Sequence, residues 1–388
     1  MKKFKLSTKD SINNINREQY HKLWSSDPNR TIFNSWEYLY ALEKSVCIGG
    51  KTGWSIKFFQ LTDRNDNVIL LAPAYLKDHS FGEYVFDWSW AEAYHRLGTE
   101  YYPKILLASP FSPIEGARLL GSDKAESIST FKRLIEDWCF EGRYSSIHVL
   151  FCDQMEKREL SDTAWLTRKT VQFHWQNKDY RSFDQFMTSL QQKKRKKIRS
   201  EREKIKNLGI KCKSYRGSEI SENLIVFFYQ CYCKTYFDHG NPPYLNLDFF
   251  LLLLDQVSNS MVLIIAYLNE ETPIASSLSF VEVIDGKITK LYGRYWGALN
   301  NISNLHFEVA YYALIEWCIK HGVQTFEGGA QGEHKLARGF EPIITHSIHW
   351  ISNSRFRTPI RSFLNNEDQY IDSYLETLKL RTPFKNEF

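Results

Sequence analysis

The stretch Glu327–Phe340, which reads EGGAQGEHKLARGF, gathers side chains that can take part in chemistry. A glutamate and a histidine can accept a proton, a lysine and an arginine can stabilise an anion or hold a phosphate, and a glutamine can form hydrogen bonds. In order, these residues are Gln331, Glu333, His334, Lys335 and Arg338. Arg338 has a structural alternative, which is an ion pair with Glu327 or Glu333. Because the stretch is rich in glycine and has no apolar period, it is expected to be a polar loop.

The elements before this loop are expected to place it at the end of a buried strand. Apolar residues at helical spacing predict a helix that starts at Ser303 or Asn304 and ends before Gly322. His306, on its first turn, is expected to be a core or capping residue. A short strand over Val323–Phe326 leads into the polar stretch, the kind of position where α/β sheets usually bind ligands. The strand before the helix ends in side chains suited to ligand contact: Tyr292, Arg294 and Tyr295.

A second chemical signal is a basic segment inside a helix predicted from Ser182, its N-cap, to Gly209. Its cations follow one another closely: Lys193, Lys194, Arg195, Lys196, Lys197, Arg199 and Arg202. Such a face binds a polyanion (a tRNA, a nucleotide diphosphate or phospholipid headgroups), or it is simply a solvated surface.

Composition narrows the class of protein. A chain of 388 residues is long for one core, so two domains are expected. The net charge of +5 is modest and concentrated in the basic segment. The seven cysteines form neither a disulfide framework nor a zinc-ligand pattern, which favours reduced thiols, a cytoplasmic location and no metal. The longest apolar run, Phe249–Leu254, is too short to span a bilayer, and no signal peptide is recognised.

The order of predicted elements occurs twice. In the first half, two strands, a helix and a buried strand are expected: Trp54–Leu61, Asn67–Leu76, Ser127–Phe140 and Ser146–Phe151. In the second half, a three-stranded meander precedes the helix and strand described above: Met261–Tyr267, Pro273–Val283 and Ile288–Tyr295. The boundary between the halves is expected within residues 160–182, and a C-terminal helix over Pro359–Leu380 either packs back or dimerises.

Several strings resemble a known family. They are YGRYWG (Tyr292–Gly297), LHFE (Leu305–Glu308), Glu327–Phe340, GEYVFDWSWAEAY (Gly82–Tyr94), YYPK (Tyr101–Lys104), PFSPIEGARLL (Pro110–Leu120) and FHWQN (Phe173–Asn177). The chain resembles the Fem-type aminoacyl transferases of the GNAT superfamily. It is more similar, from about residue 30 to residue 350, to predicted N-acyltransferases labelled peptidoglycan biosynthesis or recognition.

The resemblance implies an α/β (α+β) fold with two GNAT-like domains in tandem, residues 1–175 on the acceptor side and 176–388 with the basic helix and catalytic loop. Each domain would have a mostly antiparallel sheet with one splayed strand pair. Lys335 takes the place of a lysine implicated in transfer, with Glu333 and His334 as candidate bases. The Fem-type layout assigns acceptor binding, or alternatively a packed domain interface, to His95, Arg96, Tyr101, Tyr102 and Lys104.

The implied function is an N-acyl- or aminoacyltransferase that uses no metal and no tightly bound cofactor. The acceptor is an amine on a cell-wall precursor, a peptide or a small metabolite. The donor is an aminoacyl-tRNA or an acyl-CoA. Arg294–Leu299 matches the coenzyme A loop pattern [RQ]-x-x-G-x-[GA] except at Leu299, and this departure favours the aminoacyl-tRNA. The alternative is a non-catalytic module that binds a peptidoglycan-like or RNA ligand.

Overall fold

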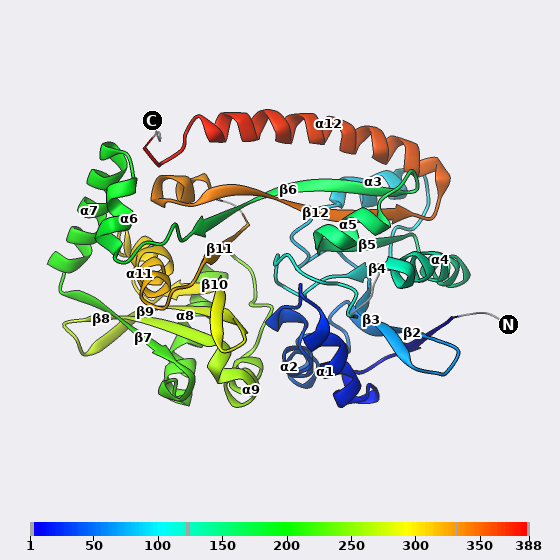
Figure 1. Cartoon of the computed structure of the whole chain (residues 1–388), viewed down its shortest axis with the longest axis horizontal. Coiled ribbons are helices and arrows are strands. Elements are labelled where there is room, and N and C mark those ends of the chain that lie inside the picture. Colours follow the sequence, from blue (N-terminus) through cyan, green and yellow to red (C-terminus); the bar gives the residue numbers. More distant parts are fainter. Residues whose placement is uncertain (1–3, 122–124, 331, 386–388) are drawn as a thin grey trace. The chain divides into compact units, whose positions relative to one another are not determined.

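The computed structural model describes residues 4–121, 125–330 and 332–385, and it divides into two compact units (Figure 1). Unit 1 comprises Met1–Thr170 and Ile344–Ser373, and unit 2 comprises Val171–Ile343 and Tyr374–Phe388. The chain changes unit within strand β6, within strand β12 and within helix α12. The units are therefore not two consecutive stretches of sequence, and the expected domains 1–175 and 176–388 stay a prediction.

Unit 1 contains the described elements that precede residue 170. In chain order they are β1 (Lys5–Lys9), η1 (Ile12–Asn14), α1 (Arg17–Ser26), η2 (Ile32–Asn34), α2 (Trp36–Lys44), β2 (Trp54–Thr62), β3 (Val68–Lys77), α3 (Trp88–Arg96), β4 (Lys104–Leu107), α4 (Ala125–Glu141), β5 (Ser146–Cys152), α5 (Gln154–Leu160) and the start of β6 (Trp165–Gln176). Most of β12 (Glu341–Ile351) and α12 (Ser354–Lys379) joins them. The strands lie in the order β1-β2-β3-β4-β5-β12.

Unit 2 contains the second half of β6 and the elements that follow it. They are α6 (Phe183–Ser189), α7 (Gln192–Asn207), β7 (Ile210–Arg216), η3 (Gly217–Glu219), α8 (Glu222–Asp238), α9 (Leu247–Val257), η4 (Ser258–Ser260), β8 (Met261–Leu268), β9 (Thr272–Ile284), β10 (Lys287–Ala298), α10 (Leu305–Phe307), the π-helix η5 (Glu308–Tyr312), α11 (Ala313–Lys320), β11 (Thr325–Ala330) and the 3-10 helix η6 (Glu333–Arg338). The strands lie in the order β6-β11-β10-β9-β8-β7.

The two units share one pattern of strand pairing. From β1 to β12, unit 1 has three antiparallel pairs, one parallel pair (β4–β5) and one antiparallel pair. From β7 to β6, unit 2 repeats that sequence, with β10–β11 as its parallel pair. The shared pattern favours the predicted architectural repeat, and a tandem of two GNAT-like domains stays a prediction.

Two local expectations were wrong. The single helix predicted from Ser182 to Gly209 is two helices, because Leu190 between them is extended, buried and bridged to Phe384. The stretch Glu327–Phe340 is not an open loop, since β11 continues to Ala330 and η6 follows. The region 160–182, expected to contain the boundary between the halves, contains the 12-residue strand β6, and the chain changes unit within that strand, between Thr170 and Val171.

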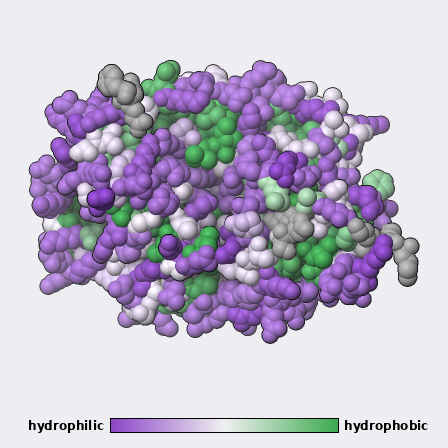
Figure 2. All heavy atoms as spheres, viewed as in Figure 1, coloured by the Kyte–Doolittle hydropathy of each residue, from purple (hydrophilic) through white to green (hydrophobic). Residues whose placement is uncertain are grey.

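The surface and the thiols complete the description. Figure 2 shows one face of the molecule, on which hydrophilic side chains predominate and hydrophobic ones form separate small patches. All seven cysteines are free thiols. Among the helices that the structure describes, none combines the length and the apolar character needed to cross a membrane.

Candidate active site

The parallel strands β10 and β11 of unit 2 separate after a short paired stretch. Among the described residues, they pair at Lys290, Leu291 and Tyr292 of β10, whereas β10 stays paired with β9 as far as Ala298. Beyond Tyr292, no described strand pairs with the edge of β10 that faced β11. Backbone donors at such a place must find another partner, which makes the separation a natural position for a ligand.

A cavity of about 90 Å³ occupies this separation, and we call it the β10–β11 cavity. Its polar walls come from Ser279 of β9, Arg294 of β10 and His306 of α10, and its apolar walls include Trp296 and Leu314. The Ser279 hydroxyl is buried and makes no hydrogen bond with any described residue. Such a group is normally paired in a folded protein, so it is available to a bound molecule.

The helix beside the cavity is irregular at that point. The sequence predicted one helix after a Ser303 or Asn304 cap, but Asn304 adopts a left-handed conformation and its side chain makes no cap. A π-turn over Glu308–Tyr312 follows α10, and the carbonyl of Val309 accepts a hydrogen bond from Ser277 at 3.0 Å. Single π-turns often occur at functional sites because they redirect side chains.

His306 was expected to be a core or capping residue, but it lines the cavity. Its ring packs against Trp296 with 4.5 Å between centroids. Burial, together with His334, Lys335 and Arg338, lowers the pKa of His306 to about 4. The imidazole is therefore neutral near pH 7 and can accept a proton.

Lys335, on η6, is buried rather than exposed to solvent, and it contacts Gly329, the residue after Gly328 of the cavity wall. Only 4% of its surface is exposed, and its Nζ donates to the carbonyl of Gly329 at 3.1 Å. Burial, with a contribution from the charge of Arg294, lowers the pKa of Lys335 to about 8. The ammonium is thus still the main form at neutral pH, but its surroundings disfavour the charge.

Glu333 and His334 precede Lys335 and face different partners. Glu333 is exposed and accepts hydrogen bonds from Tyr374 at 3.0 Å and Arg381 at 2.5 Å. The His334 ring is 3.1 Å from the hydroxyl of Tyr311, which lines the cavity, and burial lowers its pKa. Of the two predicted bases, His334 therefore contacts the cavity wall and Glu333 is engaged elsewhere.

Arg338 is 2% exposed and forms an ion pair with Glu201 of α7 at 2.9 Å. Its guanidinium also lies 3.3 Å from the centre of the Phe307 ring. The structural alternatives considered from the sequence, Glu327 and Glu333, are not its partners. This buried pair fixes η6 against α7, so Arg338 positions the segment that carries Lys335.

The remaining residues that were expected to contact a ligand near β10 and η6 are mostly packed against other parts of unit 2. Tyr292 is buried, and Tyr295 packs its ring against Tyr232 and Phe250 while one side lines the cavity. Gln331 lies outside the described residues. Gly297, read as part of a coenzyme A loop, belongs to β10, and a Cβ there would lie 2.0 Å from the carbonyl oxygen of Cys231. This glycine permits close packing of α8.

Sequence reasoning missed the pairing of Glu327 with His174. The two residues are register partners on β11 and β6, and Lys290 lies 3.5 Å from the Glu327 carboxylate. Glu327 is 1% exposed. Both occur in strings that resemble the family, FHWQN and EGGAQG, but nothing in the sequence indicates that they meet.

The basic residues of α7 divide into two groups. Lys193, Lys196, Lys197 and Arg199 are exposed, whereas Lys194 and Arg195 are half-buried. Burial and neighbouring cations lower the pKa of Lys194. Lys197 lies 3.9 Å from Glu201, a weak contact, so most of this charge faces solvent.

The predicted acceptor residues of unit 1 do not form one accessible group. His95 and Arg96 are exposed at the end of α3, where Arg96 pairs with Glu92. Tyr101 is buried and donates to Asp87 at 2.6 Å, and half-buried Tyr102 bonds to Ser80.

Lys104 is the centre of a closed network in unit 1. It is fully buried, and its Nζ donates to Ser80 and Glu83 at 2.8 Å and to Asp87 at 2.5 Å. Burial alone would lower the pKa of Lys104, but the charges of Glu83 and Asp87 raise it above the ordinary value. The network is therefore built around a charged lysine.

Comparison with known proteins shows the family of this chain and solved structures with a similar fold. The chain belongs to the FemAB-like family, described as peptidoglycan biosynthesis/recognition, which matches residues 11–386. No curated protein matches it. L-PGS from Bacillus licheniformis is similar in structure, with a TM-score of 0.53, 7% identity and coverage of 90% of this chain and 97% of that one. A conserved protein of unknown function from Bacteroides thetaiotaomicron has a TM-score of 0.50, 11% identity and coverage of 89% and 100%. The predicted α/β, FemAB-like fold is confirmed.

Proposed function

We propose that the protein is an N-acyl- or aminoacyltransferase and that transfer takes place in the β10–β11 cavity. The observation that carries this proposal is the separation of β10 from β11, where a cavity is lined by a neutral histidine and a buried lysine bonds to Gly329, directly after Gly328 of the cavity wall. Membership of the FemAB-like family and the fold support the same class of reaction.

The residues present fit the steps of such a transfer. The acceptor amine attacks the donor carbonyl, a C–N bond forms, and negative charge develops on the carbonyl oxygen. Lys335 and Arg294 supply positive charge near that oxygen, and the Ser279 hydroxyl supplies a hydrogen bond. His306 takes the proton that the amine loses and returns it to the leaving oxygen or sulfur as the bond to the donor breaks.

For the donor, we propose an aminoacyl-tRNA, with an acyl-CoA as the alternative. Residues 294–298 are part of β10, Leu299 follows directly after its end, and the segment is packed under α8 through Gly297, so it does not form the loop that the coenzyme A pattern describes. The exposed cations of α7 suit a polynucleotide. For the acceptor, we keep an amine on a cell-wall precursor, a peptide or a small metabolite, with His95, Arg96 and Tyr102 as the accessible candidates in unit 1.

The test uses two labelled donors and a mixed acceptor pool. The protein is incubated with tRNA charged with radiolabelled amino acids, or with labelled acetyl-CoA, together with a deproteinised cell extract. Aminoacyl esters and thioesters are cleaved by mild base, whereas amides survive. We expect base-stable labelled product from the wild type. If neither donor gives such product, the alternative of a non-catalytic binding module replaces the proposal.

A matched pair of variants connects the activity to the cavity. Ala310 lines the β10–β11 cavity, and Ala313, on the same helical segment, lines a different cavity. Ala310→Leu is expected to abolish product formation by filling the cavity, whereas Ala313→Leu is expected to retain it. Equal activity of the two variants would remove the cavity from the mechanism.

A further inference from the structure

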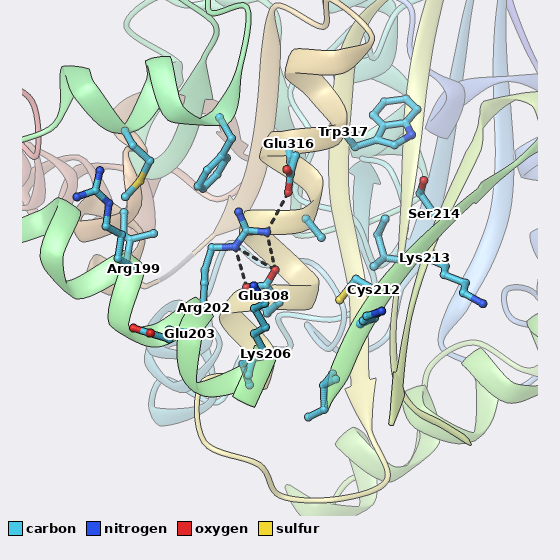
Figure 3. Close-up of a pocket in the computed structure, with 18 of the residues that line it drawn as sticks. Arg199, Arg202, Glu203, Lys206, Cys212, Lys213, Ser214, Glu308, Glu316 and Trp317 are labelled. Carbon is cyan, nitrogen blue, oxygen red and sulfur yellow. Dashed lines mark hydrogen bonds and ion pairs between the residues drawn. The ribbon is translucent and has the colours of Figure 1, made fainter. Parts of the chain in front are cut away.

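A larger groove lies on the other side of α11 from the β10–β11 cavity. It has a volume of about 840 Å³, which is within the range of ligand-binding pockets. One wall is α7, another is α11, and the third is β7, so we call it the β7 groove. Figure 3 shows Arg202 of α7 reaching to Glu308 and Glu316, with Cys212 and Lys213 on the neighbouring strand. The mechanism proposed above uses none of these residues.

The first notable property of the groove is that it follows a sheet edge. In the described strand order, β7 is the last strand of unit 2, and β8 is its neighbour on the other side. Consecutive residues Ile210–Ser214 of β7 all line the groove. In a strand, side chains point alternately to opposite faces, so a cavity that touches every residue runs along the backbone edge. That edge presents N–H and C=O groups that can pair with another strand.

The second property is the charge of the walls. Six basic residues line the groove, Arg199, Arg202, Lys206, Lys211, Lys213 and Lys320, against four acidic ones, Asp184, Glu203, Glu308 and Glu316. Arg202 engages Glu308 and Glu316, and Lys211 pairs with Glu270. Within the described part of the chain, Arg199, Lys206, Lys213 and Lys320 make no ion pair. The cations available to a ligand therefore outnumber Asp184 and Glu203.

The third property is an apolar floor. Ile205 of α7, Ile210 of β7, Ile264 of β8 and Trp317 of α11 contribute to the lining. Register places Ile264 opposite Ser214, so both belong to the face of the sheet that the helices cover. An extended segment on the β7 edge would thus place alternate side chains over this floor and the others on the opposite face of the sheet, the face of Lys211 and Lys213.

We propose that the β7 groove binds an extended acidic peptide segment, which pairs with the edge of β7 as an added strand. Backbone hydrogen bonds to β7 provide affinity, and small apolar side chains cover the floor beneath the helices. Carboxylates on the opposite face of the added strand meet Lys213, and the exposed ammonium groups of Lys206 and Lys320 attract the acidic segment from the rim of the groove. The lysines on β7 discourage pairing with a second copy of this basic edge, which selects a partner of opposite charge. The proposal goes beyond acyl transfer and does not depend on it.

The test measures binding of fluorescein-labelled peptides by anisotropy. The probe is a short peptide of alternating glutamate and valine. One control has lysine in place of glutamate, and another carries N-methyl groups on alternate amides, which removes the donors that strand pairing needs. We expect saturable binding of the probe and at least tenfold weaker binding of both controls. Absence of binding, or equal binding of the N-methylated peptide, would overturn the proposal.

Matched charge reversals on one helix test the position. Lys206 lines the groove, whereas Lys204 of the same helix is exposed and does not line it. Lys206→Glu is expected to weaken binding of the acidic probe at least tenfold, and Lys204→Glu is expected to change it less than twofold. A loss as large in Lys204→Glu as in the groove variant would show general attraction to the basic surface and contradict the assignment. Because only binding is measured, failure here is distinguishable from failure of the transferase proposal.

Discussion

The two units have a parallel strand pair at the same place in their sheet order, but the space beyond the pair differs. In unit 1, β4 and β5 also pair at only three positions. The chain then returns to this sheet, where Gly116 bridges to Cys152 of β5 and Leu120 bridges to Leu71 of β3. The Arg118 side chain donates to the carbonyl of Leu150 at 2.7 Å. In unit 2, the corresponding separation of β10 and β11 contains the β10–β11 cavity.

The two units also differ in the surroundings of their buried lysines. Lys104 in unit 1 is surrounded by carboxylates that raise its pKa, and Lys335 in unit 2 is buried where its pKa falls to about 8. A raised pKa means that folding stabilises the lysine charge, and a lowered pKa means that folding opposes it. A charge held against its surroundings is a sign of function, although structural networks can also produce such shifts. The same pairing pattern thus accompanies a closed, ion-paired lysine network in unit 1 and a cavity in unit 2.

The largest expected effect on stability separates these lysines. Lys104→Met leaves Asp87 and Glu83 buried without their cation, so unfolding should become easier by about 3–5 kcal/mol. Lys335→Met, of similar volume, should cost less than about 1.5 kcal/mol. Denaturant unfolding of both proteins makes the measurement. Similar losses in the two variants would contradict the contrast between the units.

The next effect concerns pH. Turnover should require neutral His306 and charged Lys335, whose pKa values lie near 4 and 8. The rate should therefore rise with pH through about 4, stay level, and fall as pH passes about 8, where Lys335 loses its proton. Lys335→Arg keeps its charge in alkali, so it should retain activity above pH 9. A rate that instead rises through pH 8 would assign Lys335 as the proton acceptor.

The role of His306 in the pH dependence of turnover is tested by replacing its ring. His306→Phe keeps an aromatic ring against Trp296 but has no nitrogen to accept a proton. Turnover is expected to fall by roughly 100-fold, as is usual for loss of a general base. His334→Phe should lower turnover by less than tenfold. If His334→Phe is the more damaging change, the base is on η6 instead of α10.

The smallest expected effect concerns donor binding by α7. Replacing the exposed Lys193, Lys196 and Lys197 with glutamate should leave folding within about 0.5 kcal/mol of the wild type. Affinity for tRNA should fall, and its dependence on salt should become shallower. Filter binding over a series of salt concentrations measures both. If the salt dependence of tRNA affinity is unchanged, the exposed lysines of α7 are a solvated helix face and do not bind the donor.

Much of the architecture could be predicted from local sequence signals. Ser182 caps a helix as expected, because its side chain accepts a hydrogen bond from the backbone of Gln185 in the first turn. The hairpin β2–β3 and the meander β8–β10 follow from alternating apolar residues. Strands β6 and β12 were missed because their partners are far away in the chain. The pairing of β11 with β6, for example, joins Glu327 to His174.

The site was harder to predict than the fold, for two physical reasons. A glycine-rich polar string has the composition of a solvent loop, so the burial of Lys335 and the Arg338–Glu201 pair leave no local signal. The π-turn over Glu308–Tyr312 has no sequence signature either, and it changes which residues face the cavity. The sequence therefore indicated the segment that carries Lys335 but not the neighbouring His306 or Ser279.

The most direct test of the central claim is the single-turnover rate of Lys335→Met with a saturating donor. The variant keeps the length of the side chain, and unfolding measurements establish that it is folded. If the ammonium stabilises the developing oxyanion beside the β10–β11 cavity, the rate should fall by roughly 100-fold or more. Loss of substrate affinity alone would spare the rate at saturation. A folded Lys335→Met protein with the wild-type single-turnover rate would contradict the assignment of transfer to this site.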